Sequence, residues 1–301
     1  MVTNRKSRVA IVTNSAIALP HEMIKDYNIR LVPPSFTMDG HTYRDSEDIQ
    51  LEDVYAYLEK GKPFLTTPGS PYDYLEAYRE VAQRASAILC LTIPRKLSTM
   101  FDSARTAMEM AGEAIPEVPI RVLDCGSLAG AQGLIVLAAA TKAVAGESLE
   151  QVITATETAI RATDFLLLFK TVRYAARTGR LPRMLAEVGN LLGVKGLITI
   201  ADGRVKMVSL HRSMAAGIQR LIKVTAERAG NTPVMAIVMH SGYSKEVEEF
   251  AAWISGQLKC KQILLSQFSP IVAYIAGPGA LGVAFCPTHF LYPESEFKEI
   301  R

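Results

Sequence analysis

The first half of the chain alternates short, β-branched apolar runs with longer segments of helical periodicity, and this alternation limits the fold more than any other feature. Four runs are strand candidates: residues 9–13, 29–32, 87–93 and 120–123. Three segments have apolar residues at i, i+3 and i+4, the spacing of amphipathic helices: residues 72–85, 99–114 and 128–145. Strands that alternate with helices favour a parallel, doubly wound sheet.

The second half follows a different pattern. Its strand candidates are residues 165–169, 196–200, 206–210 and 234–240, with one or two more within 269–285. Its helix candidates are residues 149–162, 214–229 and 245–258. Asp202-Gly203 between two strand candidates is a hairpin signal, so we expect a second α/β domain with a mixed sheet. A chain of 301 residues is longer than a single hydrophobic core usually organises. We therefore predict two domains, residues 1–155 and 156–301, with a ligand site between them.

Composition excludes several classes of protein. With 49% hydrophobic and 21% charged residues, the chain has the composition of a globular protein. Its net charge of +3 is too small to indicate general electrostatic attraction to nucleic acid. The cysteines and histidines lack the spacing of a zinc site or a disulfide scaffold, so no metal is expected. The apolar stretch 128–140 is too short to span a bilayer, and we expect a cytoplasmic protein without a transmembrane segment.

Two hydroxyl-rich stretches each appear before a predicted helix. Thr66 and Thr67 precede Ser70, which has capping-box spacing to Asp73, and Ser98 precedes Thr99, which has the same spacing to Asp102. Helix N-termini at the carboxyl edge of a parallel sheet could bind a carboxylate or phosphate, with these hydroxyls as donors. Simple helix capping is the alternative interpretation, and spacing alone does not decide between them.

Other motifs are weaker. Residues 277–282 match Gly-x-Gly-x-x-Gly, but they precede a strand-like run near the C-terminus, so a tight turn is favoured over a dinucleotide site. Basic residues recur at helical spacing from Lys170 to Arg180, which is typical of a solvated helix face or of a docking surface for an acidic partner. The chain has neither a phosphate-binding P-loop nor a Gly-x-Ser-x-Gly elbow.

Taken in order, these segments resemble the DegV family from Val9 to Phe285. The motifs that carry the resemblance are Thr13-Asn14-Ser15, Val32-Pro33, Asp39-Gly40, Thr66-Thr67-Pro68-Gly69-Ser70, Leu97-Ser98-Thr99-Met100, Asp124-Cys125, Thr178-Gly179-Arg180-Leu181, Arg212-Ser213 and Gly277-Pro278-Gly279. No single motif is decisive, but the ordered set is fairly specific.

The resemblance implies a non-catalytic carrier that binds a long-chain fatty acid, needs no cofactor, and presents its ligand to a separate fatty acid kinase. Carried over residue by residue, Thr66 and Ser98 are the expected contacts of the carboxylate, with Thr67 and Thr99 beside them. The same comparison associates Arg180, Arg212, Gly277 and Gly279 with the head region or with partner docking. We expect the walls of the tail pocket to come from the apolar helices of the first domain.

Departures from the family pattern leave alternatives open. Asn14 stands where the family has Asp, and Ile275 stands where it has His two residues before Gly-Pro-Gly, which removes a polar partner for the ligand head. One alternative is an enzyme acting on a small phosphorylated or carboxylated substrate. Another is a docking protein that uses the basic residues from Lys170 to Arg183.

Overall fold

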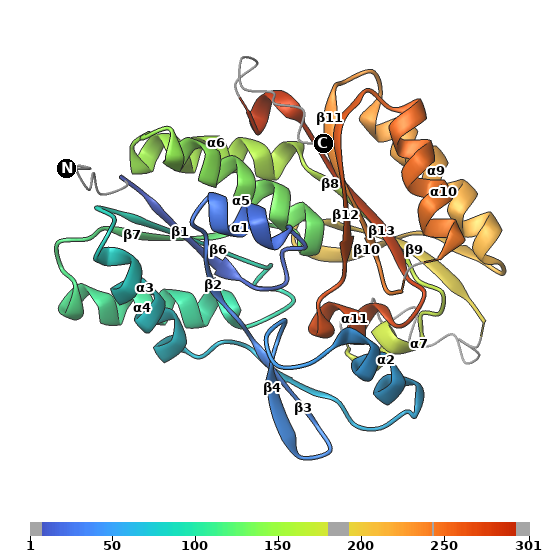
Figure 1. Cartoon of the computed structure of the whole chain (residues 1–301), viewed down its shortest axis with the longest axis horizontal. Coiled ribbons are helices and arrows are strands. Elements are labelled where there is room, and N and C mark those ends of the chain that lie inside the picture. The colour runs from blue at the N-terminus through green and yellow to red at the C-terminus, as the bar shows by residue number, and fades with distance from the viewer. Residues whose placement is uncertain (1–7, 180–192, 243, 293–301) are drawn as a thin grey trace.

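The computed structural model describes residues 8–179, 193–242 and 244–292. Two large sheets organise them, one parallel and one mixed, and a small third sheet lies beside both (Figure 1). The predicted fold class is confirmed: an α/β protein with a parallel, doubly wound sheet domain and a second domain with a mixed sheet.

The parallel sheet has the strand order β2-β1-β6-β7, and every neighbouring pair is parallel. Its strands are β1 (Ala10–Asn14), β2 (Arg30–Val32), β6 (Ile88–Thr92) and β7 (Ile120–Asp124). Helices α3 (Pro71–Ala82) and α4 (Met100–Ala114) pack together against one face. Helices cover both faces, which is why β1 and β6 are buried at every position and read as continuous apolar runs.

The mixed sheet has the order β10-β9-β8-β13-β11-β12, in which only β11 and β12 pair in parallel. Its strands are β8 (Asp164–Leu168), β9 (Lys195–Ala201), β10 (Arg204–His211), β11 (Val234–His240), β12 (Cys260–Gln267) and β13 (Leu281–Pro287). Helices α9 (Met214–Ala229) and α10 (Lys245–Gln257) cover its outer face (Figure 1). Strand β12 was missed by the sequence analysis.

Helix α5 (Ala129–Val144) lies between the two large sheets and contacts strands of both, with α6 (Leu149–Ala162) packed along it (Figure 1). Fourteen of its residues are buried, which confirms that the apolar stretch at 128–140 is an interior helix. Glycines permit this close packing, because a Cβ at Gly133 would collide with the backbone oxygen of Ile17. The boundary at 155/156 falls within α6 and stays a prediction.

The third sheet, of order β4-β3-β5, was not expected from the sequence. Its strands are β3 (Ser35–Met38), β4 (His41–Arg44) and β5 (Leu65–Thr67), all antiparallel. The remaining elements are α1 (His21–Asp26), α2 (Leu51–Glu59), α7 (Arg173–Arg177), α11 (Pro270–Ala276) and the 3-10 turn η1 (Thr288–Phe290). The expected one or two strands within 269–285 prove to be one, β13, which begins only at Leu281. The helix α11 before it was not predicted: Ser269 caps it and Pro270 starts it.

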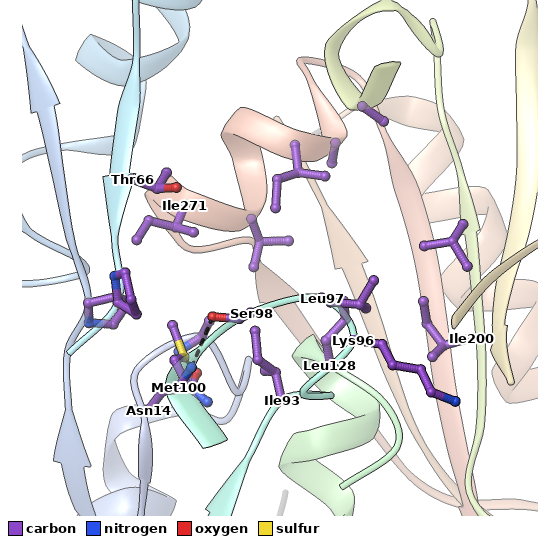
Figure 2. A pocket seen from close by; sticks show the side chains of 18 of the residues that line it. Asn14, Thr66, Ile93, Lys96, Leu97, Ser98, Met100, Leu128, Ile200 and Ile271 are labelled. Atoms are coloured by element: carbon purple, nitrogen blue, oxygen red, sulfur yellow. Dashed lines mark hydrogen bonds between the residues drawn. The ribbon is translucent and has the colours of Figure 1, made fainter. Parts of the chain in front are cut away.

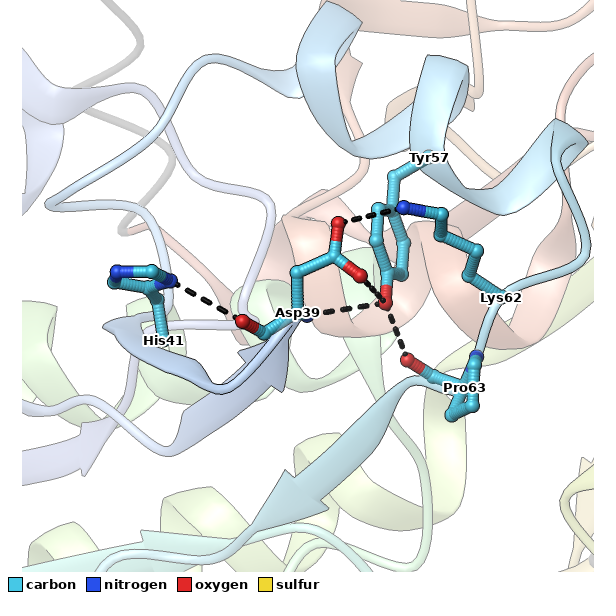
Figure 3. A network of polar contacts seen from close by, with 5 residues as sticks. All are labelled: Asp39, His41, Tyr57, Lys62 and Pro63. Carbon is cyan, nitrogen blue, oxygen red and sulfur yellow. Dashed lines mark hydrogen bonds and ion pairs between the residues drawn. The ribbon is translucent and has the colours of Figure 1, made fainter.

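Polar contacts hold the β3–β4 hairpin to the segment that leads into β5 (Figure 3). Asp39 has the positive φ of a tight turn, and its carboxylate accepts a hydrogen bond from Lys62 Nζ at 2.8 Å. The Tyr57 hydroxyl lies between them and donates to the Pro63 carbonyl at 2.8 Å. Because Pro63 is two residues before β5, the network fixes the strand that carries Thr66.

Candidate functional site

A cavity of about 430 Å³ lies where the three sheets meet. Most of its lining is apolar. Thr66, Ser98 and Asn14 lie toward one end of it, here called the polar end, whereas Lys96 lies across from them beside Ile200 (Figure 2). The lining residues are Asn14, Ala16, Pro34, Thr66, Thr67, Pro68, Ile93, Arg95, Lys96, Leu97, Ser98, Thr99, Met100, Leu128, Phe165, Leu167, Phe169, Ala175, Ile198, Ile200, Val205, Ile271, Val272, Ile275 and Ala276. A cavity of this size and composition can enclose much of a small amphipathic ligand.

All four predicted hydroxyl residues line this one cavity: Thr66, Thr67, Ser98 and Thr99. Thr66 is placed by β5, where it pairs with Phe36 of β3. Ser98 is placed by a turn after β6, in which its backbone N–H donates to the Pro94 carbonyl at 3.1 Å. The two stretches therefore converge although 31 residues separate Thr67 from Ser98 in sequence.

The local structure around these hydroxyls differs in part from the prediction. The capping box of Ser70 and Asp73 at α3 is confirmed. The matching cap at α4 is not: the Thr99 side chain makes no capping bond, and Ser98 Oγ instead accepts from the Met100 N–H at 3.3 Å. Thr66 belongs to the small antiparallel sheet, so only the Ser98 stretch extends directly from the carboxyl edge of the parallel sheet.

The apolar part of the cavity comes mainly from the second half of the chain. Phe165 and Leu167 of β8 lie on the inner face of the mixed sheet, together with Ile198 and Ile200 of β9. Helix α11 closes the opposite side with Ile271, Val272, Ile275 and Ala276. The expectation that helices of the first domain form these walls was wrong, because α5 packs tightly between the sheets and only Leu128, at its start, reaches the cavity.

The charged residues in the described lining are both basic. Among the described residues, no Asp or Glu lines the cavity, whereas Arg95 and Lys96 do. Both side chains have partners elsewhere: Lys96 Nζ donates to the Asp202 carbonyl, 2.8 Å away, and the Arg95 guanidinium lies 5.9 Å from the Phe101 ring centroid. An anionic head group at Thr66 and Ser98 would meet hydroxyl donors, with no carboxylate of the described lining opposing it.

Three of the other predicted site residues, Arg212, Gly277 and Gly279, are not among the residues that line the cavity. Arg212 is exposed between β10 and α9. Gly277 and Gly279 form the predicted turn before β13, both with φ of +73°, and Gly277 directly follows the lining residue Ala276. Arg180 lies outside the described residues. A ligand-binding role for these four residues stays a prediction.

Within the described parts of the chain, no helix has both the length and the apolarity needed to cross a bilayer. In the same residues, no group of three or more His, Cys, Asp or Glu is placed to hold a metal ion.

These features define a class of protein: a two-domain α/β fold that encloses an amphipathic cavity between its sheets. The model of the DegV family matches residues 8–288, and the chain belongs to that family. A DegV domain-containing protein of Streptomyces coelicolor is 30% identical over 277 residues, which are 91% of this chain and 97% of that protein. One from Caldanaerobacter subterraneus is 28% identical over 279 residues, 92% of this chain and 98% of that protein.

Solved structures agree with this assignment. A DegV family protein from Thermus thermophilus, described by its fatty acid binding, superposes with a TM-score of 0.85 at 27% identity and covers 93% of this chain and 99% of its own. DegV from Bacillus subtilis, described as a fatty acid binding protein, has a TM-score of 0.83 at 23% identity over 93% and 99% of the two chains. At that identity the second comparison supports the fold alone.

Proposed function

We propose that this protein binds a long-chain fatty acid, with the carboxylate at Thr66 and Ser98 and the acyl chain along the apolar walls. The observation that carries the proposal is that these two hydroxyl residues line the same cavity as the inner face of the mixed sheet and α11. Fatty acid binding is described for the Thermus thermophilus relative, which supports the same ligand class here. Thr67 and Thr99 are the neighbouring donors.

The energetics favour a ligand whose tail supplies affinity and whose head supplies orientation. Each buried methylene contributes about 0.8 kcal/mol, so eight of them supply about 6 kcal/mol. Each neutral hydrogen bond to the head adds only about 1 kcal/mol. The protein thus needs neither a metal nor a cofactor to hold its ligand, and it binds without catalysing a reaction.

Native mass spectrometry of the protein purified from cells tests the proposal directly. We expect a mass increase that matches a fatty acid, its loss after delipidation, and its return on titration with palmitic acid. Finding no co-purified fatty acid, together with no binding in the titration, would reject the proposal.

We further propose that the bound fatty acid is presented to a separate kinase, which supplies ATP and the phosphoryl chemistry. This accounts for a chain without a phosphate-binding P-loop. Incubating the loaded protein with ATP and a fatty acid kinase should yield acyl phosphate only when both proteins are present. If no acyl phosphate forms with any such kinase, the kinase partnership is rejected and the binding proposal is unaffected.

The second candidate function is an enzyme for a small phosphorylated or carboxylated substrate, favoured by the presence of the Ser98 hydroxyl and the basic residues Arg95 and Lys96 in the lining of one cavity. Turnover of such a substrate, abolished by Ser98→Ala, would support it. Inactivity across a panel of phosphate and carboxylate esters would remove it.

A further inference from the structure

Asp45 is a carboxylate with no exposure to solvent, although it follows the exposed hairpin strand β4. It does not line the cavity, yet its side chain joins segments far apart in the sequence. Ser15 Oγ donates to one carboxylate oxygen at 2.6 Å, and the Ile271 backbone N–H donates to the other at 3.0 Å.

Each segment that Asp45 joins contributes to the wall of the cavity. Ser15 lies between the lining residues Asn14 and Ala16, and Ile271 is itself a lining residue on α11. The backbone N–H of Asp45 donates to the carbonyl of Pro34, a third lining residue, at 2.9 Å. One buried side chain therefore fixes the spacing between the β1 loop and α11, two segments that border the cavity.

Two features of this arrangement are energetically unfavourable by themselves. Asp45 is fully buried, and the loss of water around its carboxylate raises its pKa despite the hydrogen bonds that lower it. The next residue, Ser46, has a φ of +65°, a backbone conformation that is unfavourable for a residue with a side chain. The buried carboxylate and the strained backbone both occur at the point where Asp45 connects the β1 loop to α11.

We propose that Asp45 is a positioning residue that sets the width of the cavity, and so its selectivity for acyl chains, by joining the β1 loop to α11. This inference rests on the proposed function, because it assigns a determinant of specificity to the same cavity. Asp45 touches no ligand in this scheme and acts only through Ser15 and Ile271.

The test compares Asp45→Leu, Asp45→Asn and the wild type in titrations with lauric, myristic, palmitic and stearic acids. Leu keeps the number and branching of the heavy atoms, although its methyl groups are larger than the oxygens, and it leaves the Ile271 N–H and the Ser15 hydroxyl unpaired. We therefore expect affinity for the preferred acid to fall about tenfold and the preference among chain lengths to flatten. Asn can accept from Ile271 and donate to Ser15, and it should restore both properties.

Leu221→Ala is the matched control, since Leu221 is buried on α9 against the outer face of the mixed sheet. It should lower the melting temperature while leaving the order of chain-length preference unchanged. If Asp45→Leu alters affinity and preference no more than Leu221→Ala does, the proposal is wrong. If Asp45→Leu does not fold, Ser15→Ala is tested instead, because it removes only the hydrogen bond from Ser15 to Asp45. An unchanged chain-length preference in that variant would also overturn the proposal.

Hydrogen exchange separates this inference from the proposed function. In the ligand-free protein, Asp45→Leu or Ser15→Ala should accelerate amide exchange in residues 270–276 more than Leu221→Ala does. If the wild-type protein binds no fatty acid, the proposed function is rejected, but hydrogen exchange still tests whether Asp45 connects the β1 loop to α11. Unchanged exchange in residues 270–276 of the variants would reject that connection.

Discussion

The two ends of the cavity come from different halves of the chain and differ in chemistry. The polar end is built by residues 14–100, with hydroxyls from Thr66 and Ser98. The apolar end is built by residues 128–276, chiefly β8, β9 and α11. The difference separates two tasks, because the apolar end can supply affinity in proportion to buried area while the polar end orients the head.

The largest effect on binding is expected when the apolar end of the cavity is filled by a larger side chain. Ile275→Trp places a large side chain in the cavity, and excluding four methylenes would cost about 3 kcal/mol, a loss of affinity on the order of a hundredfold. Titration with palmitic acid measures the loss. Ile222→Trp is the control, because Ile222 is a partly buried residue on the far face of the mixed sheet. Wild-type affinity in Ile275→Trp would show that the acyl chain lies elsewhere.

The next effect concerns the turn that ends α11. A Cβ at Gly277 would collide with the Tyr174 ring, and the φ of +73° there disfavours any side chain. We expect Gly277→Ala to lower the free energy of unfolding by roughly 2 to 3 kcal/mol. Gly146→Ala is the control: its φ of +82° is similar but no atom lies within 4 Å, so about 1 kcal/mol should be lost. Equal losses in urea denaturation would contradict the steric contribution.

A smaller effect is expected at the polar end. Thr66→Val and Ser98→Ala each remove one hydroxyl with little change in shape, and each should weaken palmitic acid binding by about 1 kcal/mol, roughly fivefold. Thr37→Val is the control on the neighbouring strand, since the Thr37 hydroxyl bonds to Thr42 at the exposed surface. If neither variant changes the affinity, the carboxylate does not lie at these hydroxyls.

The smallest effect should come from the surface network that holds β5. The hydrogen bond from Lys62 lowers the pKa of Asp39, so its contribution to stability is present above the ordinary value of 3.8 and is lost as the pH falls through the lower pKa of the folded state. Asp39→Asn should therefore lower the melting temperature slightly at neutral pH and lose this effect in acid. Fatty acid affinity should not change. A larger loss in acid than at neutral pH would contradict this sign.

The sequence predicted the parallel sheet well because βαβ units are local and their strands are strongly apolar. Its failures share one cause. The strands β3, β4 and β5 are short and polar, and β3 pairs with β5 across a gap that contains α2, so no local pattern reveals the sheet that carries Thr66. In the same way, the apolar run in α11 does not distinguish a short helix from a strand.

The cavity walls were hidden for a related reason. Phe165 and Leu167 line the cavity, whereas Leu166 and Leu168 pack under the outer helices, and all four are equally apolar. A strand covered on both faces carries no alternation of polarity, so the sequence cannot say which face borders a cavity.

By itself the sequence determined the layers of the fold, through apolar periodicity, and the hydroxyl residues, through their order along the chain. Only the tertiary structure decided that Thr66 and Ser98 line one cavity, that α11 faces β8 and β9 across an open space, and that Asp45 joins the β1 loop to α11. Periodicity records which residues leave water within one element, whereas a cavity exists only where elements distant in the chain pack incompletely.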